Sequence, residues 1–164
     1  MPVKRIMVYA EKCNGCLSCT HACMAAHSTA GTIIGALAEG VQARIHVESV
    51  NGRPVPLMCR HCEEPACVDA CMTGAMQKDP VTGLVTNEGN EQACVGCWMC
   101  IMACPYGAIV QKAGEPRIAL KCDGCKDRPI PACVEGCPNG ALVWEEVDAC
   151  AAGKRQNAAR ELVA

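Results

Sequence analysis

The sequence predicts a loop-rich α+β fold of two pseudo-symmetric modules, and three observations lead to this prediction. Cysteine accounts for 17 of the 164 residues, and the cysteines repeat in quartets. Phe is absent and aromatic residues make up 2% of the chain, so an aliphatic core alone would be thin. Short alternating apolar segments separated by glycine turns indicate strands of only a few residues. Groups bound by the cysteines are therefore expected to fasten the interior.

Sixteen cysteines form four quartets, and Cys150 lies outside them. The first and third quartets share the spacing C-x2-C-x2-C-x3-C, which is typical of loops that hold a cubane 4Fe-4S cluster. The second and fourth quartets widen only the gap before their third cysteine, where Pro65, or Pro129 and Pro131, lies in the longer loop. The quartets are Cys13, Cys16, Cys19, Cys23; Cys59, Cys62, Cys67, Cys71; Cys94, Cys97, Cys100, Cys104; and Cys122, Cys125, Cys133, Cys137.

The spacing has a mechanical reason. Three closely spaced cysteines on a tight loop can surround one face of a cluster, and Gly15, Gly96 and Gly124 supply the backbone freedom that such turns need. Backbone N–H groups in these loops are then free to point at sulfur. The fourth cysteine begins a helical turn and points away, so it is expected to bind a neighbouring cluster. The quartets must therefore work in pairs.

Two other uses of dense cysteines fit less well. Disulfide frameworks belong to oxidising compartments, whereas the first residues show neither a long apolar stretch nor twin arginines, and the cysteine count is odd. Four all-thiolate zinc sites would also use sixteen cysteines, but zinc sites usually take two separated C-x2-C pairs and do not need the nearby third cysteine. Iron-sulfur clusters in a reducing cytoplasm are the better interpretation.

Charge and hydropathy exclude other classes. The net charge of −2 and the lack of a basic block argue against nucleic acid binding. No stretch of 18 apolar residues occurs, so we expect no membrane span. No G-x-G-x-x-G fingerprint accompanies the cysteines, so flavin, NAD or pterin must belong to partner chains.

Few regular elements are expected between the quartets. Strands are expected from Val3 to Tyr9, over 43–48 before an Asn51-Gly52 turn, on both sides of Thr82-Gly83 and of Gly114, and over 142–145; a short helix is expected over 19–27. Residues 28–58 form the longest cysteine-free insertion. We expect a four-cluster domain over 1–147 and an Ala-rich tail over 148–164, either helical or frayed.

The quartet order, with Cys-x-His-Cys-x2-Pro-x-Cys-x3-Cys in the second and Lys-Cys-Asp-x-Cys in the fourth, resembles four-cluster ferredoxin subunits of multi-subunit oxidoreductases. These include subunits of dimethyl sulfoxide reductase, nitrate reductase, formate dehydrogenase, formate hydrogenlyase, carbon monoxide dehydrogenase and tungsten aldehyde oxidoreductase. The resemblance covers Ile6 to Glu145 and implies bacterial-ferredoxin-like modules, one from quartets one and four and the other from quartets two and three.

The resemblance also implies how the cysteines share four 4Fe-4S clusters, named a to d. The implied ligands are Cys13, Cys16, Cys19 and Cys137 for cluster a; Cys122, Cys125, Cys133 and Cys23 for cluster b; Cys59, Cys62, Cys67 and Cys104 for cluster c; and Cys94, Cys97, Cys100 and Cys71 for cluster d. Met72 replaces the usual proline after Cys71 but removes no ligand. His61 matches the family pattern and can tune a cluster by hydrogen bonding, contact a partner or make a structural hydrogen bond. Cys150 is expected to be a free thiol.

The array conducts electrons and is not expected to catalyse a reaction itself. We expect a cytoplasmic subunit that bridges a molybdenum, tungsten or nickel-iron catalytic subunit and a second redox partner, such as a flavin subunit, a ferredoxin or a hydrogenase. Self-association into filaments is a further expectation, because head-to-tail contacts that do not close extend without limit. A freely diffusing polyferredoxin and a zinc-stapled interaction module are the alternatives.

Overall fold

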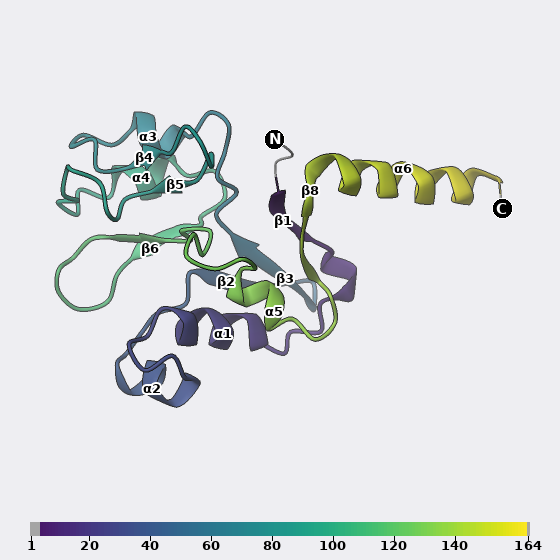
Figure 1. Cartoon of the computed structure of the whole chain (residues 1–164), viewed down its shortest axis with the longest axis horizontal. Coiled ribbons are helices and arrows are strands. Elements are labelled where there is room, and N and C mark those ends of the chain that lie inside the picture. Colours follow the sequence, from purple (N-terminus) through teal and green to yellow (C-terminus); the bar gives the residue numbers. More distant parts are fainter. Residues whose placement is uncertain (1–3, 164) are drawn as a thin grey trace.

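The computed structural model describes residues 4–163 as four two-stranded antiparallel ladders and short helices joined by cysteine-rich loops (Figure 1). Val3 and Ala164, at the ends of two expected segments, lie outside the described residues. The elements are β1 Lys4–Val8, the 3-10 turn η1 Ala10–Lys12, α1 Ser18–Ala26, α2 Ile33–Ala38, β2 Ile45–Val50, β3 Arg53–Met58, α3 Ala66–Asp69, β4 Gln77–Lys78, β5 Val85–Thr86, α4 Met99–Ala103, β6 Ile109–Gln111, β7 Ala119–Lys121, α5 Ala132–Glu135, β8 Leu142–Glu146 and α6 Val147–Val163. The predicted α+β class is confirmed.

The first and last strands pair with each other. β1 and β8 are antiparallel, with Ile6 opposite Trp144 and Val8 opposite Leu142. Each strand lies next to a cysteine quartet in the chain. The first quartet follows β1 and η1, and the fourth quartet precedes β8. The ladder therefore brings the two ends of the cysteine-rich region together.

The β2–β3 hairpin fills much of the insertion. Asn51 and Gly52 have φ values of 52° and 76°, the two positive values that a type I′ turn requires. The sequence predicted a strand followed by a turn, but the structure continues into a second strand that contains Pro54 and Pro56. Their spacing of two directs both ring nitrogens to the same edge of a two-stranded ladder, where no hydrogen bond is lost.

The insertion also contains α2, which the sequence analysis did not predict. Thr32 caps this helix, its hydroxyl accepting a hydrogen bond from the Gly35 N–H at 3.1 Å. Six residues are too few for a helical period to stand out.

Two separate apolar cores each include some of the cysteines. α1 packs against α5 in the first core and α3 against α4 in the second. The buried residues of the first core are Cys19, Cys23, Ile45, Met58, Cys133 and Leu142. Those of the second core are Met76, Val85, Cys100, Ile109 and Ala119. Aliphatic side chains thus share each core with thiols, as the composition suggested.

The C-terminal tail forms α6, which extends away from the rest of the chain (Figure 1). Cys150 is its only buried residue, and 153–163 are exposed throughout. Among residues 4–163, no helix combines the length and the apolar character that crossing a bilayer requires.

Candidate iron-sulfur sites

The first and third quartets lie on loops with the same backbone path. Gly15 and Gly96 have φ values of 75° and 69°, and the residues after the second cysteine, Leu17 and Trp98, have φ values of 60° and 64°. Two left-handed residues on either side of one cysteine turn the chain tightly, and a helix begins immediately afterwards. The tight turn carries three cysteines around a single cavity.

Three cavities are each lined by four cysteines. Each cavity has an empty volume of about 320–350 Å³, and each takes three cysteines from one loop and one from a distant quartet. The lining cysteines are Cys13, Cys16, Cys19 and Cys137; Cys59, Cys62, Cys67 and Cys104; and Cys71, Cys94, Cys97 and Cys100.

The remaining four cysteines also lie together. Cys23 and Cys133 are buried in the same core, where α1 packs on α5. Burial raises the pKa of the Cys133 thiol, and the neighbouring Cys122, Cys23 and Cys125 thiols raise it further. The four groups of thiols have the same membership as clusters a to d of the sequence analysis, and iron binding by each group stays a prediction.

Backbone N–H groups point at sulfur in all four groups. The donor and acceptor pairs are Ala141 N–H to Cys137 Sγ at 3.2 Å, Arg44 to Cys23 at 3.3 Å, Met76 to Cys71 at 3.3 Å, His61 to Cys59 at 3.4 Å and Gly124 to Cys122 at 3.4 Å. Hydrogen bonds of this kind favour the thiolate, which is the form that binds metal. Four thiolates in a largely apolar cavity are the donor set that a 4Fe-4S cluster takes.

Burial opposes thiolate formation at several of these positions. It raises the pKa of Cys67 to about 11 and that of Cys122 to about 12. Without metal these thiols stay protonated at neutral pH, so cluster binding must release protons.

The sequence of this chain matches a known protein family. Residues 50–147 match the family described as the 4Fe-4S dicluster domain. The chain belongs to this family. An iron-sulfur protein of Rhodospirillum rubrum is 39% identical over 98% of this chain and 93% of its own length. The electron transport protein HydN of Escherichia coli is 33% identical over 84% of this chain and 85% of its own length.

A further relative is the B polypeptide of the anaerobic dimethyl sulfoxide reductase of Escherichia coli, 43% identical over 56% of this chain and 45% of its own length. The chain is thus a ferredoxin-type, electron-transferring iron-sulfur protein, as the sequence analysis predicted.

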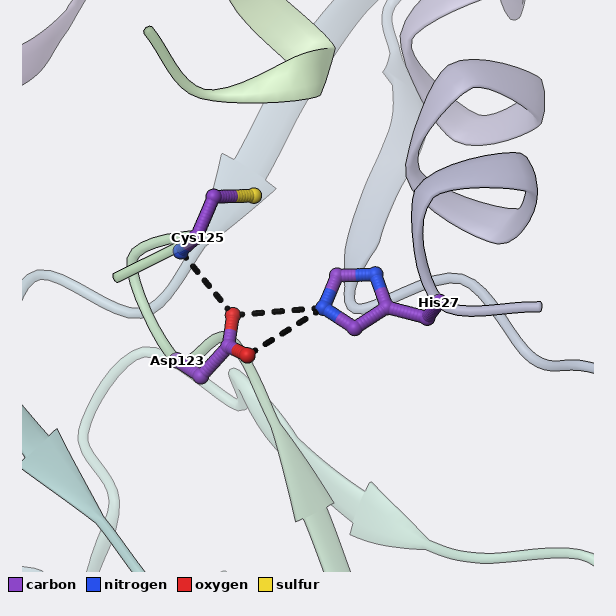
Figure 2. A group of neighbouring side chains, drawn as sticks. All are labelled: His27, Asp123 and Cys125. Atoms are coloured by element: carbon purple, nitrogen blue, oxygen red, sulfur yellow. Dashed lines mark hydrogen bonds and ion pairs between the residues drawn. The ribbon is translucent and has the colours of Figure 1, made fainter. Parts of the chain in front are cut away.

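A charged network lies beside the group b cysteines Cys23 and Cys125, and the sequence analysis did not predict it. His27 Nε2 lies 3.2 Å from Asp123 Oδ2, and the Cys125 N–H donates to Asp123 Oδ1 at 3.0 Å (Figure 2). Arg44 pairs with the same carboxylate at 3.1 Å and with Glu88 at 3.3 Å. These residues come from distant segments. Asp123 belongs to the Lys-Cys-Asp-x-Cys motif, but the motif does not indicate which residues the carboxylate pairs with.

His27, Asp123 and Cys125 lie close enough to suggest a separate metal site. Both ring nitrogens of His27 are already engaged, because Nδ1 lies 2.7 Å from the Cys23 carbonyl oxygen. Asp123 and the Cys23 thiol raise the pKa of His27 to about 10, so the ring is protonated at neutral pH and cannot ligate a metal. His27 and Asp123 therefore form an ion pair that lies beside Cys125 of group b.

His61 occupies the position that glycine holds in the other three quartets. Its φ is 47°, whereas Gly15, Gly96 and Gly124 have φ values between 69° and 77°. Its Nδ1 accepts the Val85 N–H at 2.9 Å, and burial lowers its pKa to about 3. The ring of His61 thus makes the structural hydrogen bond that was one of the roles considered for this residue.

Cys150 lies outside all four groups. It is a free, buried thiol whose Sγ is 3.6 Å from the Tyr9 hydroxyl, which donates to Glu145 at 2.7 Å.

Proposed function

We propose that the chain carries four 4Fe-4S clusters and relays single electrons between a catalytic redox subunit and a second redox partner. The observation that carries the proposal is the gathering of sixteen cysteines into four groups of four, each with three cysteines from one quartet and one from another. When bound, each cluster takes up or gives up one electron. The proposed ligands are those named above for clusters a to d.

The proposed architecture is a pair of pseudo-symmetric modules within residues 1–147, followed by a tail over 148–164. The two apolar cores support it, because one contains cysteines of the first and fourth quartets and the other adjoins cysteines of the second and third. The packing of α1 on α5 and of α3 on α4 gives further support. The chain's own residues then keep water from the buried thiols and direct N–H groups at sulfur.

Two exposed cysteines mark where partners are proposed to dock. Cys16, of group a, and Cys97, of group d, are the cysteines exposed at the surface among residues 4–163. Apolar side chains flank both: Leu17 is 44% exposed, and Val95 and Met102 are 67% and 72% exposed. Exposed apolar residues beside a redox site suit contact with another protein.

The proposed partners are the catalytic subunit of a molybdenum, tungsten or nickel-iron enzyme, for example an aldehyde oxidoreductase or formate dehydrogenase, and a flavin subunit, ferredoxin or hydrogenase. The relative named as the B polypeptide of a reductase supports a subunit role. We propose the cytoplasm as the compartment, because sixteen ligand thiols require reducing conditions.

Anaerobic purification of the tagged chain from its native cell tests both parts. We expect brown protein with about sixteen iron and sixteen sulfide per chain, four of each per cluster. Colourless, zinc-loaded protein would overturn the cluster proposal. A large redox subunit is expected to co-purify, whereas quantitative recovery of the chain alone would favour a freely diffusing polyferredoxin.

A matched pair of variants tests the ligand assignment. Cys97→Ala removes a proposed ligand of cluster d and is expected to lower iron content by about four per chain. Cys150→Ala removes a thiol outside the four groups and is expected to leave iron content unchanged. Equal iron loss in the two variants would contradict the assignment.

A further inference from the structure

Lys121 is a buried lysine with no carboxylate partner. Lys121 is 3% exposed. It is the last residue of β7 and directly precedes Cys122. Its ammonium donates to the Cys122 carbonyl oxygen at 2.7 Å and to the Val85 carbonyl oxygen. None of the ion pairs among residues 4–163 includes it. A buried charge is costly unless an opposite charge faces it, so an anionic group is needed nearby.

The ammonium of Lys121 contacts residues that belong to two different cysteine groups. Its hydrogen bond to the Val85 carbonyl oxygen reaches a residue that lines the group c cavity together with Cys59, Cys62, Cys67 and Cys104. Its hydrogen bond to the Cys122 carbonyl oxygen reaches a cysteine of group b. Lys121 therefore lies between groups b and c.

Val85 connects the two groups through hydrogen bonds. Its N–H donates to His61 Nδ1, and the backbone N–H of His61 in turn faces Cys59 Sγ of group c. Its carbonyl oxygen accepts from Lys121. Next to it, the Leu84 side chain packs so closely on Gly124 that a Cβ there would lie 2.7 Å away. Groups b and c thus meet across a packed junction whose buried cation is Lys121.

We propose that Lys121 is a positioning residue for electron transfer, the shared counter-ion of clusters b and c at the junction of the two modules. This inference rests on the proposed function. Reduction adds one negative charge to a cluster, so a fixed cation nearby favours the reduced form and raises the reduction potential. Because one ammonium faces both sites, moving an electron from one to the other changes its interaction energy little. One electron leaves one cluster and reduces the other, and no proton or ligand is exchanged.

Redox titration of the full chain, followed by electron paramagnetic resonance, tests the inference. We expect Lys121→Met and Lys121→Gln to disfavour reduction of two of the four clusters by tenfold or more, which is about 59 mV for a one-electron couple. Lys126→Met is the matched control, because Lys126 also adjoins a ligand cysteine of group b, Cys125, but is exposed to solvent. Lys121→Arg keeps the charge and is expected to keep the potentials. Equal shifts at all four clusters, or none, would overturn the inference.

Iron content separates the remaining outcomes. Lys121→Gln can still donate hydrogen bonds to a carbonyl oxygen, so it tests charge apart from donation. If both neutral variants lose iron while Lys121→Arg keeps it, the charge is required for assembly and the counter-ion role stands. If Lys121→Arg also loses iron, Lys121 acts only through packing and the inference fails. Wild-type protein with fewer than four clusters would instead refute the proposed function.

Discussion

Under the proposed function with four clusters, substitution of Gly96 by alanine is expected to release cluster d while the other three clusters remain. Gly96 has a φ of 69°, a conformation that costs an L-residue roughly 1–2 kcal/mol. A Cβ at this position would also overlap the Arg117 carbonyl oxygen and lie 3.4 Å from Trp98. A backbone oxygen cannot rotate away as a flexible side chain can, so the loop between Cys94 and Cys97 must shift.

Gly140→Ala is the control for the size of the steric cost at Gly96. Its φ is 62° and its Cβ would meet nothing within 4 Å, so Gly140→Ala carries only the backbone cost of roughly 1–2 kcal/mol. Overpacking adds roughly 1–3 kcal/mol at Gly96. Both substitutions add the same methyl group to a residue in the same backbone region. The difference between them therefore isolates the steric contact, and each 1.4 kcal/mol of it is about a tenfold change in an equilibrium constant.

The assay follows iron content and visible cluster absorption during anaerobic exposure to guanidinium chloride. We expect Gly96→Ala to lose about four iron per chain before the transition that removes the rest, and Gly140→Ala to lose iron in one transition slightly earlier than the wild type. Identical curves for the two variants would refute the reasoning, because the contact with Arg117 would then have no energetic effect.

Two further outcomes concern metal and pH. Chelation or oxidation of the clusters is expected to abolish cooperative melting measured by circular dichroism, because metal binding supplies much of the folding free energy; retained cooperative melting of cluster-free protein would contradict this. His27→Gln is expected to accelerate cluster loss in denaturant most below pH 6.5. The pKa of His27 is raised from 6.5 to about 10, so its contribution is complete below 6.5 and is lost as the pH rises towards 10. If the difference in cluster loss between His27→Gln and the wild type instead grew as the pH rises, this reasoning would be wrong.

The cysteine groups were within reach of sequence reasoning because ligand spacing is local and repeated. Each quartet fixes three thiols on one loop, whereas the fourth thiol of each group depends on the tertiary fold and was assigned only from the resemblance to four-cluster ferredoxin subunits. Lys121 and Asp123 were noticed only as part of the Lys-Cys-Asp-x-Cys motif, and Arg44 was not singled out at all. Their partners Val85, His27 and Glu88 lie far away in the chain. Nothing in the local sequence indicates which distant backbone a long side chain will reach.

His61 was recognisable but was interpreted incompletely. Aligning Cys59-Arg60-His61-Cys62 with the other three quartets places His61 on the glycine position, and this alignment predicts a left-handed histidine. Such a residue is uncommon outside glycine, although His is among the types enriched there.

The histidine persists because of what its ring contacts. Glycine at position 61 would avoid a backbone cost of roughly 1–2 kcal/mol. It would also leave the buried Val85 N–H without its acceptor, which costs roughly 1–3 kcal/mol. The two costs are similar in size, so the left-handed strain is offset at this one quartet. The other three quartets have glycine at this position. In the second quartet, His61 instead binds the N–H of Val85 in β5, whose carbonyl oxygen accepts from Lys121. The strained residue thus lies between Cys59 of group c and the strand residue Val85, whose carbonyl oxygen accepts from Lys121.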